Sequence, residues 1–522
     1  METVGVLSLL PPILAIVLAI LTKQVLISLF AGIWIGATLL CGFNPIDGLM
    51  ATFGDYIFPS MGDPSNAAVI FMAMFCGSFA LLLEKGGGAH AFAERLTKKV
   101  KTSKQAQVLA AAGGTAIFFS DSSNPVLVGP IFKPITDALK VSREKLAYIC
   151  DATTATMPSM FPFTAWGAYI ISIIAQQFEQ NNIQANPMGE FVKAVPFSFY
   201  TIGAVIMVYM IAISGFDFGP MKKAEDRARL TGKLVDDGDA SPALIRQVIL
   251  PEGSKPTMSS MIVPLLVLVG VIFAGFLWTG DFPNVGVMTA LANASTTKCL
   301  VVGFFVASIV AAVYTVRNKV MTPKEAVDTF FEGIRMMMDA VLILTLSWAI
   351  GSVCKAVGTT AFVIAHTESF LTPTVMYIAV FVIAAFTAFT TGTSWGTFAI
   401  FLPISIPLAL AINAPLGAAI GTVISGGIFG DHCSPISDTT VLSSMGASCN
   451  HIAHVKTQLP YALCVAAAAA VAYLATGLMY NTLGATGSAI LGIAITIGLS
   501  FVIAVTLCKM EGGRIKDQKA SA

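Results

Sequence analysis

A carboxylate and an imidazole are adjacent at Asp431 and His432, inside a stretch that is otherwise apolar or small. A charged side chain at the centre of a bilayer costs at least about 2.5 kcal/mol, so a function is the first hypothesis. A carboxylate holds a cation and an imidazole changes charge near neutral pH, as a proton-coupled site requires. We predict that Asp431 carries a cation or proton and that His432 is a second proton carrier. The structural alternatives are a carboxylate that caps a half-helix N-terminus and a neutral imidazole bonded to a backbone carbonyl.

Hydroxyl and carboxylate groups surround Pro435, directly after this pair. A proline inside a helix removes a backbone donor and frees carbonyl groups, so we expect two half-helices joined by unwound chain. Unwound carbonyls, hydroxyls and carboxylates are hard oxygen ligands, which suit Na+ better than a soft transition metal. The candidate ligands here are Ser434, Asp438 and Thr439. Asp438 has the alternative role of capping the second half-helix.

An earlier segment, Asp151 to Thr164, has the same character and contains Pro158. We predict a second broken helix there, with Thr154 as a candidate ligand. Asp151 lies six residues after Lys145. Its carboxylate is therefore expected to reach interfacial water, and ion coordination is the alternative.

Two further polar segments interrupt apolar stretches and are predicted to be the tips of re-entrant hairpins. Polar backbone at membrane depth is tolerated only beside protein or a water-filled cavity. The tips supply the candidate ligands Asp121, Ser122, Ser123 and Asn124 in the first hairpin and Thr393 and Ser394 in the second. We predict a Na+ site formed by Ser123, Asn124, Ser394 and Asp431. Na+ and/or H+ are the expected coupling ions, and no other cofactor is expected.

The composition sets the class of protein that holds these residues. The 522 residues are 56% hydrophobic and only 11% charged, with a mean hydropathy of +0.80, whereas typical soluble domains are about 25% charged. A soluble enzyme is therefore excluded, and no ATP-binding or hydrolase motif is present. The net charge of +1 offers no basic surface for nucleic acid. The lipid bilayer is the expected surrounding.

Apolar runs of about 18 to 25 residues recur, which is long enough for helices that cross a bilayer. We predict an all-α polytopic membrane protein with about eleven transmembrane helices, two re-entrant hairpins and two broken helices. Lys and Arg gather at 95–104, 133–145, 222–255 and 509–519, and such clusters mark cytoplasmic loops. This distribution predicts a bacterial cytoplasmic (inner) membrane protein with its N-terminus outside and its C-terminus in the cytoplasm.

The two halves of the chain resemble each other weakly at a constant offset. Lys85 and Lys355 begin matching segments 270 residues apart, and Pro134 and Pro403 are 269 residues apart. The segments of the second half lack the basic residues of the first, so we predict two inverted-topology repeats with a shared site near the midplane. The predicted division is 1–215 for the first repeat, 216–258 for a charged cytoplasmic linker, 259–480 for the second repeat, and 481–522 for an extra helix and tail.

The run from Gly426 to Ser444 resembles the signature of the NhaC-type sodium/proton antiporter family. The resemblance, together with the two polar tips, covers nearly the whole membrane part. It implies a secondary active transporter of the wider ion-transporter superfamily, working by alternating access, with a small inorganic cation as partner and a homodimer as the expected assembly. Sodium/proton antiport is the first functional hypothesis. The alternative is a sodium- or proton-coupled carrier of an amino acid or small carboxylate.

Overall fold

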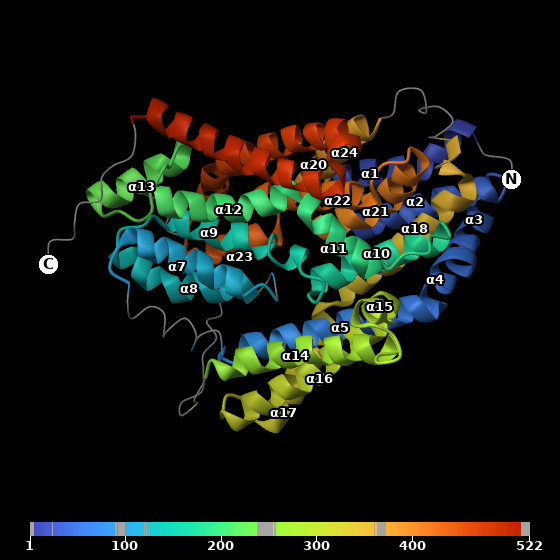
Figure 1. Cartoon of the computed structure of the whole chain (residues 1–522), viewed down its shortest axis with the longest axis horizontal. Helices are drawn as coiled ribbons and strands as arrows, with labels where there is room; N and C mark the ends of the chain where they lie inside the picture. The colour runs from blue at the N-terminus through green and yellow to red at the C-terminus, as the bar shows by residue number, and fades with distance from the viewer. Residues whose placement is uncertain are drawn as a thin grey trace.

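The computed structural model describes residues 5–22, 24–88, 91, 100–119, 121, 123–236, 254, 257–359, 361–362 and 372–512. Within these ranges the chain forms helices joined by turns and contains no β-strand. Most long helices run along the long axis of the molecule (Figure 1). The prediction of an all-α protein is confirmed.

The described helices have the length and apolar character of membrane spans. Nine of them are long and apolar enough to cross a membrane, or up to eleven when each bent pair counts as one span. Many large apolar side chains face outward, including Leu266 at 65% and Trp278 at 86% exposed. Exposed apolar surface on this scale fits contact with lipid rather than water. The expected polytopic membrane protein is therefore the fold that the chain adopts.

The first hairpin consists of α7 (Ser103–Ala116) and α8 (Ser123–Ala138), which pack against each other. The second consists of α20 (Pro373–Thr391) and α21 (Ser394–Ala411). Gly392, with φ 69°, ends α20 in the left-handed conformation, and Thr393 caps α21. The left-handed region is open to glycine without a side-chain clash, so this tip turns within two residues.

Both predicted helix breaks are present. In the first, α9 (Arg143–Thr154) and the short helix η3 (Pro158–Met160) meet α10 (Ala165–Gln180) at a bend of 41°. In the second, α22 (Leu416–Cys433) ends before Pro435, and α23 (Asp438–Ala447) follows. Each break places polar groups in the interior, where side chains bond to backbone carbonyls outside the regular helix. Thr164 donates to the carbonyl oxygen of Pro158 at 2.7 Å, and His451 Nε2 lies 2.6 Å from that of Pro435.

The helices form two layers (Figure 1). One contains α5 (Pro64–Lys85), α14 (Ser259–Thr279), α16 (Thr296–Arg317) and α17 (Pro323–Met336), which pack together. The other contains both broken helices, α12 (Phe199–Ser214), α20 and α24 (His451–Met510). Between and beside them lie α1 (Leu10–Thr22), α2 (Val25–Leu40), α3 (Pro45–Ala51), α4 (Phe58–Gly62), α11 (Pro187–Ala194), α15 (Val287–Asn293) and α18 (Met338–Val357).

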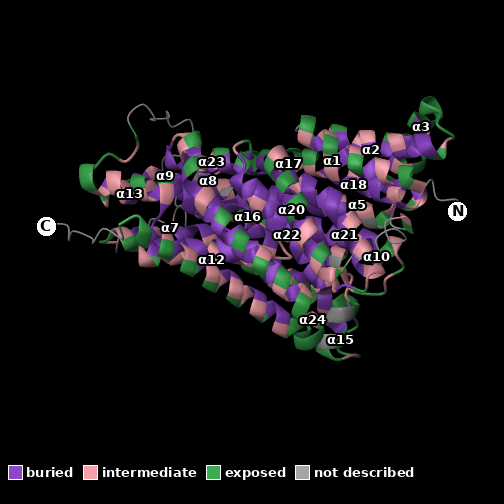
Figure 2. Ribbon diagram, turned by 90° about the horizontal axis from the view of Figure 1, so that it is seen from above, coloured by how far each residue is buried: buried purple, intermediate pink, exposed green. Residues whose placement is uncertain are grey.

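Burial is most complete along α9 and α22, and α22 lies in the middle of the molecule (Figure 2). Gly430 of α22 lies so close to α20 that an added Cβ would meet the carbonyl oxygen of Ala385 at 2.2 Å. The two helices thus approach at backbone distance, which holds the end of α22 in the interior. Asp431, the next residue, takes its buried position from this packing.

Helix α24 contains a turn at Gly484, with φ 67° and ψ −174°, which divides its 60 residues into two spans. The second span corresponds to the extra helix predicted from residue 481. The predicted linker 216–258 contains α13 (Gly219–Thr231), which packs on α9 and α24. Residues 237–253 and the basic clusters at 95–99 and 514–519 lie outside the described residues. The domain boundaries and the inversion of the repeats stay predictions.

Hairpin α7–α8 is held against α23 by a pair of glycines. A Cβ at Gly446 would lie 2.3 Å from the carbonyl oxygen of Pro125, and one at Gly129 would lie 2.3 Å from Gly446. We expect Gly446→Ala to destabilise the protein by about 1–3 kcal/mol, because two backbones must separate. Gly498→Ala is the control, since nothing lies within 4 Å of its added Cβ. Thermal unfolding in detergent checks this, and equal melting of the two variants would contradict it.

Candidate functional site

The carboxylate of Asp431 lies in the last turn of α22 and is 2% exposed. Its Oδ2 accepts a hydrogen bond of 2.7 Å from the Ser394 hydroxyl at the tip of the second hairpin. The same hydroxyl lies 3.1 Å from the carbonyl oxygen of Gly427. Asp431 Oδ1 has no hydrogen-bond partner within the described part of the chain. A buried carboxylate oxygen without a donor is costly, and a bound proton or cation would satisfy it.

Asp431 does not cap a half-helix N-terminus, because it lies at the C-terminal end of α22. Asp438 is the residue at such a terminus: it begins α23, and its Oδ1 accepts from the backbone N–H of Thr439 at 2.8 Å. The Thr439 hydroxyl is bonded to that of Ser437 at 2.9 Å. Ser434 donates to the carbonyl oxygen of Phe389 at 2.7 Å, which ties the break to the end of α20.

His432 is buried among helices and is 2% exposed, as is Asp431 beside it. Its Nδ1 is 2.7 Å from the hydroxyl of Tyr200 on α12, and its Nε2 has no partner among the described residues. Its partner is therefore a phenol rather than the backbone carbonyl of the structural alternative. The side-chain amide of Gln458 donates to the carbonyl oxygen of His432.

Tyr200→Phe leaves the His432 ring buried with neither nitrogen bonded to a described group. We expect it to destabilise the protein by about 1–3 kcal/mol, which is the usual cost of such an orphaned group. Tyr480→Phe is the control, because Tyr480 is half-buried and its hydroxyl makes no hydrogen bond to the described residues. Thermal unfolding of the three proteins checks this. A Tyr200→Phe variant as stable as the control would show that the phenol does not support His432.

The first hairpin tip lies beside the first broken helix. Asn124 is fully buried, and its Nδ2 donates to the carbonyl oxygens of Gly114 at 2.8 Å and Thr153 at 3.3 Å. Its Oδ1 has no partner within the described ranges. Asp121 accepts from the indole of Trp166 at 2.9 Å, beside a cavity of about 20 Å³. Ser122 lies outside the described residues, as does the side chain of Ser123.

The predicted Na+ ligands fall into two groups. Ser394 and Asp431 are in direct contact. Asn124 and the backbone of Ser123 lie at the start of α8, which packs mainly against α9 and α23 rather than α22. The hydroxyls of Thr154 and Thr393 are used locally: Thr154 donates to the carbonyl oxygen of Cys150 at 2.7 Å, and Thr393 accepts from the N–H of Gly396 at 3.5 Å.

Aromatic side chains connect the two tips. The ring centroids of Trp166 and Trp395 are 5.6 Å apart with an interplanar angle of 64°, and the ring centroid of Tyr169 lies 4.4 Å from that of Trp395. Trp166 and Trp395 occupy the same place in the similar runs Thr164-Ala-Trp-Gly167 and Thr393-Ser-Trp-Gly396, and Thr164 caps α10 as Thr393 caps α21. The resemblance between these runs thus reflects a shared local structure.

Asp151 is buried at 1% exposure, so the expectation that it reaches interfacial water is wrong. It is 3.2 Å from His454 and 2.7 Å from Gln458, both on α24. Neither of these two was predicted from the sequence, and nor was Tyr200. His454 and Gln458 are four residues apart, which puts both on one helix face, and this spacing is the feature of the sequence that could have indicated a shared polar contact.

The match to a family model decides the relationship to known proteins. The model described as the Na+/H+ antiporter family matches residues 159–478, which include the second hairpin and both half-helices around Asp431. The chain belongs to the Na+/H+ antiporter family. The resemblance of the run from Gly426 to Ser444 to this family is thereby confirmed. This antiporter-family member is therefore a secondary transporter.

Relatives of this Na+/H+ antiporter family member include proteins with and without a named solute. An uncharacterized protein of Haemophilus influenzae is 35% identical over 91% of this chain and 92% of its own length. A malate-2H(+)/Na(+)-lactate antiporter of Bacillus subtilis is 30% identical over 30% of this chain and 34% of its own length. The YdaH transporter of Alcanivorax borkumensis has a similar fold, with a TM-score of 0.58 and 15% identity over 87% of this chain and 90% of its own.

Proposed function

We propose that this protein is a sodium/proton antiporter that works by alternating access, with Asp431 as the shared site of Na+ and H+. The observation that carries the proposal is the buried Asp431 carboxylate, with one oxygen held by Ser394 and the other without a partner among the described residues. Membership of the Na+/H+ antiporter family supports it.

One carboxylate suffices to couple the two ions. A proton on Asp431 Oδ1 neutralises the buried charge, and so does a Na+ ion bound by this oxygen and nearby hydroxyl or carbonyl oxygens. The two ions compete for the same atom, so the carboxylate carries one or the other but not both. Crossing with the empty, charged carboxylate is opposed by desolvation. Exchange of Na+ for H+ follows from this competition.

The hairpins and broken helices supply the moving parts in this proposal. Inverted repeats would present the site near Asp431 to one side of the bilayer and then to the other. The distribution of Lys and Arg supports a bacterial cytoplasmic membrane with the N-terminus outside and the C-terminus inside. A homodimer is proposed on family analogy alone.

Everted membrane vesicles from cells that make the protein test this function. Added Na+ should dissipate a pre-formed pH gradient across these vesicles, and vesicles without the protein should keep it. The proposal fails if Na+ leaves the gradient intact while the protein is present and folded.

A second candidate is a sodium- or proton-coupled carrier of an amino acid or small carboxylate. The observation that favours it is the pair Trp166 and Trp395 between the two tips, where apolar walls and polar groups meet. The relative named as a malate/lactate antiporter supports it. A screen of labelled carboxylates and amino acids in proteoliposomes, with and without Na+, discriminates the two. Ion-dependent uptake of one solute would favour this candidate, and no uptake would count against it.

A further inference from the structure

A second buried carboxylate–imidazole pair lies outside the site at Asp431. Asp151 of α9 and His454 of α24 are 1% and 0% exposed, and His454 Nε2 is 3.2 Å from Asp151 Oδ2. Gln458 donates to the same Oδ2 at 2.7 Å and also to the carbonyl oxygen of His432. The pair therefore joins α9, α24 and the end of α22, which carries Asp431.

Three polar atoms of this group have no hydrogen-bond partner among the described residues: Asp151 Oδ1, His454 Nδ1 and Gln458 Oε1. Because an ionised Asp151 only accepts, the hydrogen of a neutral His454 belongs on Nε2. That assignment leaves the lone pair of Nδ1 buried and unused. These three buried atoms without partners would lower the stability of the fold if their role were only structural, because each has lost its hydration and gained no hydrogen bond.

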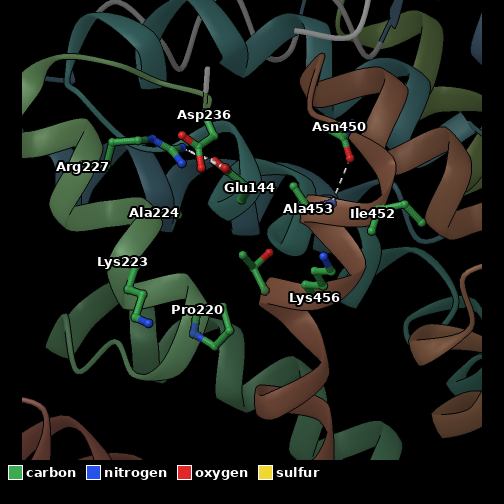
Figure 3. A pocket seen from close by; sticks show the side chains of 11 residues that line it. Glu144, Pro220, Lys223, Ala224, Arg227, Asp236, Asn450, Ile452, Ala453 and Lys456 are labelled. Atoms are coloured by element: carbon green, nitrogen blue, oxygen red, sulfur yellow. Dashed lines mark hydrogen bonds and ion pairs between the residues drawn. The ribbon is translucent and has the colours of Figure 1, made fainter. Parts of the chain in front are cut away.

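A polar cavity of about 490 Å³ lies next to this pair. Figure 3 shows it between α13, which contributes Lys223 and Arg227, and the start of α24, which contributes Ala453 and Lys456. Thr457 also lines it, so residues on both sides of His454 form one wall. The cavity is lined mainly by polar and charged side chains from elements that carry the basic clusters, which mark the cytoplasmic side.

One basic side chain of the cavity wall is held in an ion pair, and two lysines of the wall are not. Arg227 binds both carboxylate oxygens of Glu144, at 2.8 and 3.0 Å, on the α9 wall. Lys223 and Lys456 form no ion pair with the described residues. Glu144 precedes Asp151 by seven residues, or about 10 Å along a helix. The cavity wall thus lies within about two helical turns of the buried pair.

We infer that Asp151 and His454 form a second proton-binding site, which exchanges protons between the cytoplasmic cavity and the transport site. This inference rests on the proposed function. A proton from a hydronium ion in the cavity passes through intervening water to His454 Nδ1; the hydronium ion becomes water, and the imidazole becomes a cation. The Nε2–H of that imidazolium donates to Asp151 Oδ2, so the new charge is paired where it forms. On release toward the transport site, Nδ1–H gives its proton to a water molecule on that side, which becomes a hydronium ion, and the imidazole returns to its neutral form.

Other ionisable groups lie near the pair, and they also contribute to the pH dependence of transport. Those that interact electrostatically with Asp151 are His432, Asp431 and Cys433 on α22, Asp438 on α23, Tyr200 on α12 and Cys150 on α9. Lys223, Lys456, Arg227 and Glu144 face the cavity from α13, α24 and α9. Because replacement of Asp151 also removes its electrostatic effect on these groups, the pair is identified by a loss of Na+/H+ exchange that Asp151→Asn and His454→Gln share.

The test separates proton delivery from Na+ movement in proteoliposomes that contain the full chain. Wild type is expected to exchange Na+ for H+, and also to exchange labelled Na+ for unlabelled Na+ with no proton gradient. His454→Gln and Asp151→Asn are each expected to slow Na+/H+ exchange at least about tenfold, since proton relays contribute on this scale or more. Both should retain Na+/Na+ exchange within about twofold of wild type.

The result that overturns the inference is Na+/H+ exchange at the wild-type rate and with the wild-type pH profile in either variant. Equal loss of both exchange modes in a folded variant overturns it as well, because that outcome shows a structural role. Asp151→Glu, which keeps the acid, should recover exchange relative to Asp151→Asn and serves if His454→Gln fails to fold. If wild type shows no Na+/H+ exchange at all, the proposed function itself fails, and that outcome is distinct.

Discussion

Asp431→Asn is expected to abolish Na+/H+ exchange. The asparagine side-chain amide in this variant has the size of the carboxylate, and its oxygen can still accept the 2.7 Å hydrogen bond from Ser394. It can neither take up a proton near neutral pH nor offer a negative charge to Na+. Removal of the shared charge therefore removes both halves of the exchange. The measurement is Na+-driven dissipation of a pH gradient in everted vesicles, where we expect no response above that of empty membranes.

A matched control for this change exists on the surface. Asp328 of α17 is exposed and forms no hydrogen bond or ion pair within the described residues, so Asp328→Asn makes the same chemical change away from the site. We expect it to transport at the wild-type rate. Normal exchange by folded Asp431→Asn would remove Asp431 from the mechanism. Loss of exchange in both folded variants would contradict a role specific to the position of Asp431.

Ser394→Ala is expected to weaken Na+ binding. Its hydroxyl is the donor to Asp431 and a neighbour of the Gly427 carbonyl oxygen, so its loss removes an oxygen next to the carboxylate and frees Oδ2. A hydrogen bond to a charged group contributes about 1.5–3 kcal/mol, which corresponds to roughly 10- to 150-fold in affinity. The expected result is a KM for Na+ raised by about that factor, with proton-dependent exchange still present at saturating Na+.

The control for Ser394 lies on the same helix. Ser405 of α21 is also fully buried, but its hydroxyl has no hydrogen-bond partner among the described residues. Ser405→Ala makes the same substitution and is expected to leave the KM for Na+ unchanged. If Ser394→Ala and Ser405→Ala gave the same KM, the hairpin tip would not contribute to the cation site.

Much of this fold could be predicted from the sequence because its physical causes are local. Apolar runs define the spans, and Pro158 and Pro435 mark the two breaks that the structure contains. Gly392 and Thr393 mark the turn of the second hairpin. Each of these signals depends on backbone chemistry within a few residues, so one sequence suffices to see them.

The contacts of the site were less predictable because they join distant segments. The bond from Ser394 to Asp431 spans 37 residues, whereas those from His454 and Gln458 to Asp151 span 303 and 307. The expectation for Asp151 used its closeness to Lys145 in sequence. The structure buries that lysine too, in an ion pair with Asp217 that also receives the Tyr461 hydroxyl. Burial of this kind depends on packing of α13 and α24 onto α9, which no local pattern reveals.

The most direct test of the account measures both ions at once in proteoliposomes of the purified protein. An inward Na+ gradient is applied while labelled Na+ uptake and internal pH are recorded. We predict that Na+ enters while protons leave, with a constant ratio of the two fluxes. Proton exit should stop when external Na+ is omitted. Na+ entry with no opposite movement of protons would contradict the claim that Asp431 is shared by the two ions.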